Sequence, residues 1–140
     1  MRRVYTAHLA AVSLFTDCSR SELQRIASIA DELDDRAGTV IVQQGRTGHE
    51  LYLVLEGAAT VWRDGDRVAE LGPGDYFGEL GLLARAERDA SVVAATDVHL
   101  LVIGQRPFLA LVDEVPRLAT KMLRLMAHRL RASDLDGLPV

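Results

Sequence analysis

The spacing of hydrophobic and polar residues changes twice along the chain and divides it into three zones. In residues 6–33, apolar side chains recur at intervals of three and four, as they do on one face of a helix. In residues 37–103 the interval shortens to two, the period of a β-strand. From Gln105 onward the helical period returns. We therefore predict helices, then strands, then helices.

Local signals support each zone. Ser19 and Glu22 have the spacing of a capping box, which predicts the start of a helix. Gly, Pro and Asp residues separate the apolar runs of the middle zone, a pattern typical of a β-roll or barrel rather than of βαβ units. Pro116 suits the first turn of the last helix. The strands are predicted at 40–43, 51–56, 58–62, 67–71, 91–95 and 98–103.

Length and composition narrow the class of protein. A chain of 140 residues, 49% hydrophobic and 26% charged, suits one folded domain, which we predict to span 1–140. The net charge of −4 disfavours a nucleic-acid surface. Cys18 is the only cysteine, which favours a reducing compartment, and no stretch approaches the ~20 apolar residues of a membrane span. We expect a cytoplasmic protein with no membrane partner.

The segment from Gly72 to Ala95 carries the candidate chemistry. A glycine-rich turn leads into a short helical turn that begins at Glu79, and after a polar loop Arg88 is predicted to open a strand. The start of a helix offers backbone N–H groups to an anion. Arg88 offers a fork of donors to two phosphate oxygens, and Glu79 offers acceptors to a sugar hydroxyl. The combination favours a ribose joined to a phosphate.

These residues also resemble a known motif. Phe77-Gly78-Glu79-Leu80-Gly81-Leu82-Leu83, followed by Arg88, Ala90 and Val92, is similar to the phosphate-binding cassette of cyclic-nucleotide-binding domains of the catabolite-activator and kinase-regulatory-subunit type. The resemblance covers roughly residues 12–131. It implies a mainly β fold: an eight-stranded, jelly-roll-like β-roll at about 34–104 with N-terminal helices, a short cassette helix and two C-terminal helices at about 105–132. It also implies a regulatory binding module that is not an enzyme.

The resemblance assigns roles to individual residues. Glu79 would bind the ribose 2′-hydroxyl, Arg88 the cyclic phosphate, and backbone amides near Leu80 and Ala90 would complete the phosphate site. The ligand would be cAMP or cGMP, with cAMP favoured and no metal required. The predicted nucleotide-binding residues are Phe77, Gly78, Glu79, Leu80, Gly81, Arg88, Asp89 and Ala90.

The last helix is expected to act as a lid over the base and to signal by closing. Its candidate base-facing or partner-facing residues are Met122, Leu125, Met126 and Arg129. The same helix could form a homodimer, and the effector protein is not identified by the sequence. Relatives that are transcription factors continue into a helix-turn-helix, whereas this sequence stops at Val140, so no DNA partner is expected.

Asp89 departs from the cassette, which usually has Ser, Thr or Ala after the arginine. A carboxylate that faced the phosphate would repel it by ~1–4 kcal/mol, depending on the local dielectric. Alternatively, Asp89 turns outward or pairs with Arg88. The departure makes weak binding of nucleotide an expectation.

Two other functions stay open at this point. The chain could be a degenerate copy of the fold that binds a protein and no nucleotide, and Asp89 is the best argument for it. Separately, Arg88 and Glu79 could form only a structural ion pair. It could also be a cupin-like metalloenzyme, which would need clustered histidines. The histidines are instead scattered along the sequence, at His8, His49, His99 and His128.

Overall fold

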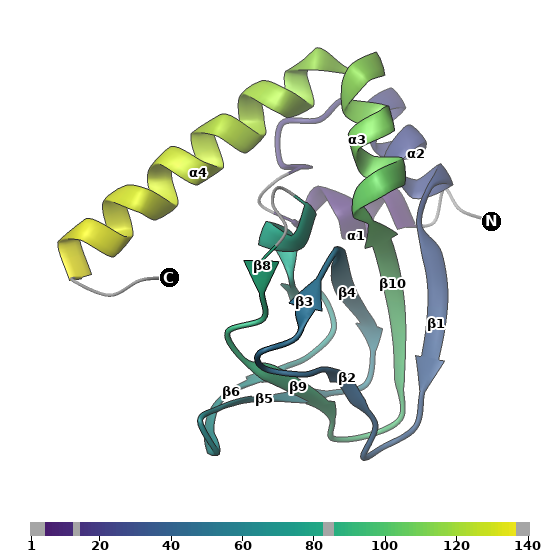
Figure 1. Ribbon diagram of the computed structural model, residues 1–140. Coiled ribbons are helices and arrows are strands. Elements are labelled where there is room, and N and C mark those ends of the chain that lie inside the picture. Colours follow the sequence, from purple (N-terminus) through teal and green to yellow (C-terminus); the bar gives the residue numbers. More distant parts are fainter. Residues whose placement is uncertain (1–4, 13–14, 83–85, 137–140) are drawn as a thin grey trace.

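Strand pairing brings distant parts of the chain into two antiparallel sheets of four strands each (Figure 1). The computed structural model describes residues 5–12, 15–82 and 86–136. The first sheet has the order β1 (Asp31–Asp35), β10 (Val98–Gly104), β4 (Glu50–Glu56) and β7 (Tyr76–Phe77). The second has the order β2 (Val40–Val42), β9 (Ser91–Ala94), β5 (Ala59–Arg63) and β6 (Asp66–Leu71). A short third pair joins β3 (Thr47–Gly48) to β8 (Ala86–Glu87).

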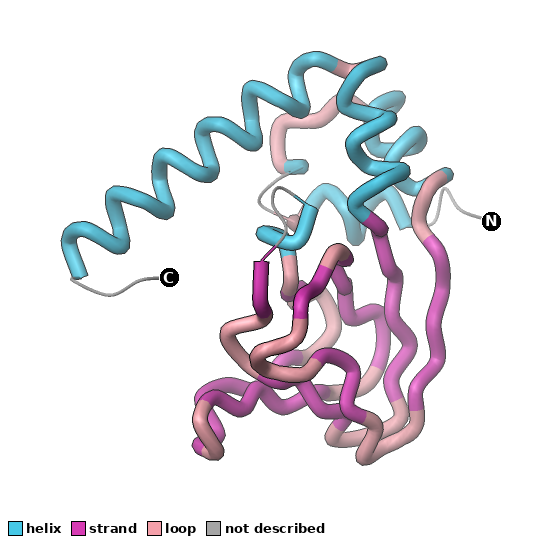
Figure 2. Tube along the Cα trace, viewed as in Figure 1, coloured by secondary structure: helices cyan, strands magenta, loops and turns pink. Residues whose placement is uncertain are grey.

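The predicted fold is confirmed, because helices flank a β-roll whose two larger sheets together contain eight strands. The helices gather at one end of the strands (Figure 2). The capping box is formed, with the Glu22 N–H donating to Ser19 Oγ over 3.1 Å and the Ser19 N–H donating to Glu22 Oε1 over 2.7 Å. The helices are α1 (Thr6–Ala10), α2 (Arg20–Ser28), the 3-10 helix η3 (Glu79–Leu82), α3 (Gln105–Glu114) and α4 (Pro116–Asp136).

Strand β4 lies between two hydrophobic clusters and supplies both. Alternate residues of a strand point to opposite faces. Leu51, Leu53 and Leu55 pack in the larger cluster, together with the helices. Tyr52 and Val54 pack in the smaller cluster, inside the roll. Every residue from 51 to 55 is buried, which explains why this part of the strand is a continuous apolar run. Through its two faces the strand packs the roll against the helices.

Three predicted boundaries were wrong. The N-terminal helical zone was extended to residue 33, but β1 begins at Asp31. Four of its five residues are exposed, so the strand has no apolar alternation, and only pairing with β10 makes it a strand. Arg88 lies between β8 and β9 rather than opening a strand, and α4 continues to Asp136 instead of ending near 132.

A histidine attaches this acidic edge strand to β10. His99 Nδ1 lies 2.5 Å from Asp34 Oδ1, and His99 Nε2 lies 3.0 Å from Glu32 Oε1. The hydrogen bond to Asp34, assisted by the one to Glu32, raises the pKa of His99 above its usual 6.5. The imidazolium form can donate to both carboxylates at once, so it is the form that favours the paired strand.

This arrangement predicts a pH-dependent contribution to stability. A pKa that is raised on folding stabilises the folded state fully below the unfolded pKa, and the contribution is lost as pH rises through the folded pKa. The free energy of unfolding, measured with urea, should therefore fall by about 0.2–1 kcal/mol in the wild type as the pH rises above ~6.5. In His99→Gln this fall should be absent. The matched control is His128→Gln, which replaces an exposed histidine of α4. Identical pH profiles for wild type and His99→Gln would contradict the assignment.

Candidate functional site

A cavity of about 440 Å³ lies inside the roll, and the predicted cassette forms one side of it. Strands of the second sheet supply an apolar wall of Val42, Val61, Leu71 and Val92. Seven of the eight residues predicted to bind nucleotide line this cavity, and the eighth, Leu80, lies in η3 with its side chain outside the described set. The seven are Phe77, Gly78, Glu79, Gly81, Arg88, Asp89 and Ala90.

The Arg88 side chain is largely buried in this cavity wall. Its side chain is 11% exposed, and its Nη2 donates to the backbone carbonyl of Glu50 over 3.0 Å. Oε1 of the same glutamate lies 3.6 Å from Nη2. The guanidinium carbon lies 5.9 Å from the centre of the Tyr52 ring, within the range of a cation–π contact. Tyr52 in turn stacks on Phe77, with 4.9 Å between the ring centres.

Two glycines leave the space that the guanidinium occupies, and a third lies beside it. A Cβ on Gly48 would lie 1.8 Å from Arg88 Nε, and one on Gly78 would lie 2.4 Å from Nη1. One on Gly81 would lie 3.4 Å from Nη1. Gly78 also has φ of +81°, a conformation that L side chains rarely adopt. We call Gly48, Gly78 and Gly81 the glycine cradle.

The backbone of Arg88 is held as firmly as its side chain. Its N–H donates to the Arg46 carbonyl, and its carbonyl accepts from the Gly45 N–H, both over 2.8 Å. The pairing of Gly48 with Ala86 places β3 beside the end of the cassette. Arg88 Nε is buried and has no hydrogen-bond acceptor among the described residues. Since buried polar groups are nearly always paired, this N–H is open to an acceptor from outside the described residues.

Glu79 stands at the start of η3 and lines the same cavity. It is one of the few buried polar residues, with an exposed fraction of 8%. Among ion pairs between described residues, the partner of Arg88 is Glu50.

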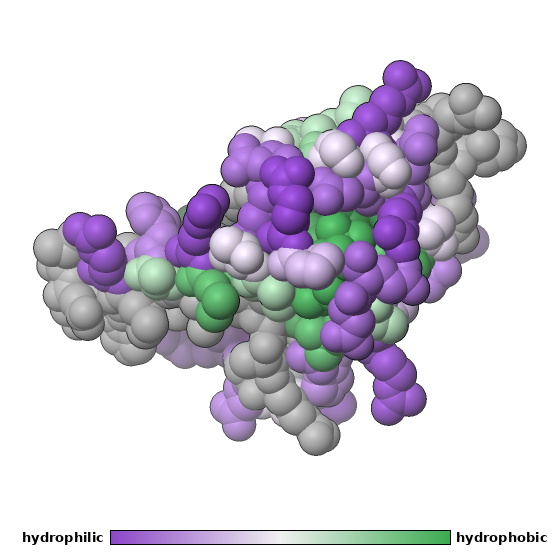
Figure 3. Space-filling model, turned by 90° about the horizontal axis from the view of Figure 1, so that it is seen from above, coloured by the Kyte–Doolittle hydropathy of each residue, from purple (hydrophilic) through white to green (hydrophobic). Residues whose placement is uncertain are grey.

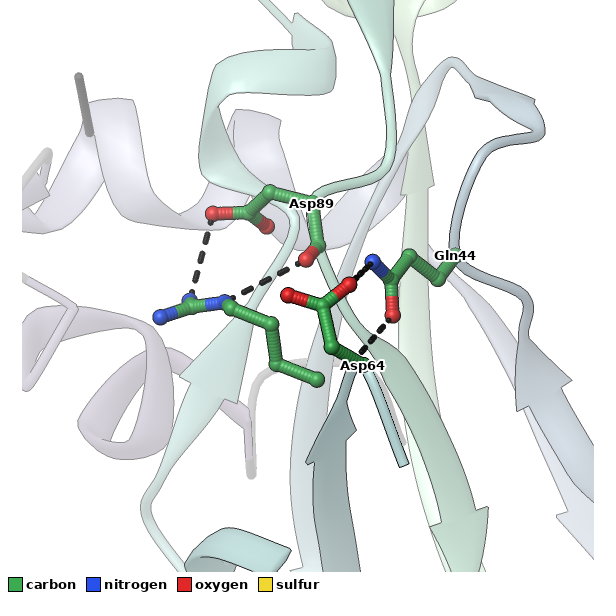
Figure 4. A network of polar contacts seen from close by, with 4 residues as sticks. Gln44, Asp64 and Asp89 are labelled. Carbon is green, nitrogen blue, oxygen red and sulfur yellow. Dashed lines mark hydrogen bonds and ion pairs between the residues drawn. The ribbon is translucent and has the colours of Figure 1, made fainter. Parts of the chain in front are cut away.

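Asp89 turns outward and pairs with an arginine, but that arginine is not Arg88. Its side chain is 73% exposed, and Oδ2 lies 3.4 Å from Nη2 of Arg63 on β5. Arg63 Nε also donates to the Asp89 carbonyl over 3.3 Å (Figure 4). The Arg88 guanidinium is not available to Asp89, because the glycine cradle and Glu50 hold it.

Sequence reasoning did not identify four residues of this site. Glu50 and Tyr52 lie two positions apart on β4, a spacing that places both on one face. That spacing was the available signal for them. Gly48 was noted only as resembling a turn of the family and was not assigned to the site. Arg63 had no signal, because it reaches the cassette through a contact with Asp89, 26 residues away in the sequence.

Met122 is the one predicted lid residue whose side chain the structure describes. Met122 is half-buried against the larger hydrophobic cluster and does not line the cavity. The side chains of Leu125, Met126 and Arg129 fall outside the described residues. The role of these four residues stays a prediction.

Among the described residues, no three or more His, Cys, Asp or Glu side chains are arranged to hold a metal ion. The same residues contain no helix with the length and apolar character needed to cross a bilayer.

Known proteins resemble this chain in sequence and in fold. The family model for the cyclic nucleotide-binding domain matches residues 35–115. The cyclic AMP receptor protein of Thermus thermophilus is 40% identical over 104 residues, which are 71% of this chain and 48% of that protein. A cAMP-dependent protein kinase regulatory subunit of Hypocrea atroviridis is 31% identical over 137 residues, 98% of this chain and 29% of that protein.

A solved structure agrees with these matches. The N-terminal domain of a transcriptional regulator from Streptomyces coelicolor A3(2) superposes with a TM-score of 0.83 at 29% identity, covering 94% of this chain and 96% of that one. The chain spans about half the length of the Thermus relative and less than a third of the fungal one. Because the family model covers more than half of the sequence and the cassette geometry agrees with it, this chain belongs to the family of cyclic nucleotide-binding domains.

Proposed function

We propose that the cavity binds cAMP and that binding is the input of a regulatory switch. Arg88 binds the cyclic phosphate and Glu79 the ribose 2′-hydroxyl. One observation carries the proposal: a buried guanidinium, fixed by Glu50 and the glycine cradle, keeps an Nε–H without an acceptor among the described residues. A fixed cation with a spare donor suits an anionic ligand.

The family supports a regulatory role in place of catalysis. The relatives described above are a receptor protein and a kinase regulatory subunit, and both names specify cAMP rather than cGMP. The apolar wall of Val42, Val61, Leu71 and Val92 offers the purine a dry surface, as small-molecule sites usually do. We therefore favour cAMP as the ligand.

The output in this proposal is a movement of the C-terminal helices over the base. Leu118 is buried and Met122 half-buried against the helical core, whereas Leu123 is 72% exposed. Beyond these residues the helix extends past the rest of the molecule, as seen from the side (Figure 1) and from above (Figure 3). A ligand shifts such an element only through contacts that differ between its two positions. The predicted lid residues would supply those contacts.

Calorimetric titration of the chain with cAMP and with cGMP tests the ligand, and Arg88→Ala tests its position. The substitution removes a charge-assisted contact and should weaken cAMP binding by ~2–4 kcal/mol while the protein stays folded. Arg67→Ala, which removes an exposed arginine that pairs with Glu70 on β6, should leave binding unchanged. Equal affinity of Arg88→Ala and wild type would exclude Arg88 as the phosphate ligand. No binding of either nucleotide by the wild type would favour the protein-interaction alternative.

The glycine cradle provides a test that keeps every charge. Gly48→Ala would place a methyl group 1.8 Å from Arg88 Nε, and the guanidinium would have to leave its position. We expect at least tenfold weaker cAMP binding, or ~1.4 kcal/mol. Gly72→Ala is the matched control, because its Cβ meets no atom within 4 Å. Equal cAMP affinity of Gly48→Ala and Gly72→Ala would show that the position of Arg88 is not important for binding.

Removal of residues 125–140 tests the lid without exposing the helical core. Leu118 and Met122, which pack against that core, are retained. The variant should fold and bind cAMP about tenfold more weakly, since three of the four predicted lid residues are lost. Sedimentation of both forms tests the predicted homodimer. If the truncated variant binds cAMP as tightly as the full chain, the C-terminal part of the helix has no role in nucleotide binding.

A further inference from the structure

The charges that line the cavity do not favour an anion. Among the described lining residues, Arg63 and Arg88 are positive, whereas Glu79, Glu87 and Asp89 are negative. The two cations are thus outnumbered by three carboxylates. A negatively charged ligand enters such a site only if each cation is well placed and the nearest carboxylate is neutralised.

Asp89 is the carboxylate that most needs neutralising, because it follows the predicted phosphate ligand directly in sequence. Arg63 reaches it twice, through the contacts of 3.4 Å to the carboxylate and 3.3 Å to the backbone carbonyl. The contact to the carboxylate is long for a hydrogen bond, so its attraction is mainly between charges. The Arg63 side chain is half exposed, and it lies at the cavity wall beside Asp89.

The position of Arg63 is set by a clamp at the end of its strand. Gln44 Nε2 donates to Asp64 Oδ1 over 2.8 Å, and the Asp64 N–H donates to Gln44 Oε1 over 2.9 Å (Figure 4). Asp64 has φ of +54°, so these bonds hold a turn conformation that a non-glycine residue seldom adopts. The Gln44 N–H also donates to Ser91 Oγ over 2.8 Å. The clamp therefore joins the β5–β6 hairpin to the strand that follows Asp89.

We infer that Arg63 is a positioning residue of the nucleotide site, which holds the Asp89 carboxylate at the cavity mouth and offsets its charge. This role rests on the proposed function. It changes the expectation for Asp89, because a compensated carboxylate repels the phosphate far less than a free one. Among the described residues, Arg63 supplies the second positive charge of the cavity wall, and Arg63 and Asp89 act as one unit.

A double-mutant cycle with Arg63→Gln and Asp89→Asn tests the unit, with cAMP affinity measured by calorimetry at low ionic strength. Arg63→Gln should weaken binding about fivefold, since it removes a positive charge from the cavity wall and leaves the Asp89 carboxylate at the cavity mouth uncompensated. Asp89→Asn should strengthen cAMP binding severalfold, because it removes a negative charge and leaves the Arg63 charge unpaired at the cavity wall. The double variant should return to within about twofold of wild type. Arg63→Lys should retain most of the affinity, and Arg67→Gln should be neutral.

The readouts separate this role from a structural one. The loss in Arg63→Gln should shrink as salt is raised to about 1 M, because exposed charges are then screened. The coupling would be overturned if Arg63→Gln bound cAMP as tightly as the wild type. It would also be overturned if Arg63→Gln weakened binding equally in the wild type and in Asp89→Asn. Either result would leave the proposed function intact. No binding by the wild type would overturn the proposed function and this role with it.

Discussion

The burial of one guanidinium organises the site. Arg88 can lie inside the roll only because Gly48 and Gly78 leave room for it, and because Glu50 offers both a carbonyl and a carboxylate. A charge that is taken out of water and incompletely compensated is costly. The cradle therefore makes sense as a site that is completed by an anion, and the turns around it serve to hold the arginine in place.

The same constraint explains why β4 is central to the fold. Its outward-pointing leucines pack with the helices, its Tyr52 lies under the guanidinium, and its first residue, Glu50, binds Arg88. A shift of register by one residue would exchange these faces and remove both the core and the arginine support. The stability of the roll and the geometry of the site thus depend on one strand.

The sequence predicted what is encoded locally. The capping box, the strand alternation and the cassette from Phe77 to Ala90 depend on neighbouring residues, and seven of the eight predicted site residues line one cavity. It did not predict β1, because an acidic edge strand is defined by its partner and not by its own pattern. Nor could it predict that Asp89 meets Arg63, a contact that forms only when two sheet strands pair.

Packing offers a physical route from the cavity to the C-terminal helix. Glu79 begins η3, and Leu82 at its other end is fully buried in the larger cluster. Leu118 of α4 is buried in that cluster too, with Phe108 of α3. Well-packed interiors resist compression, so a displacement of η3 around a ribose and phosphate has to be met by a displacement of the residues packed on it. Closure of the helix in the proposed switch would then follow from movement of the cassette itself, and direct contacts between the lid and the base would add to it rather than initiate it.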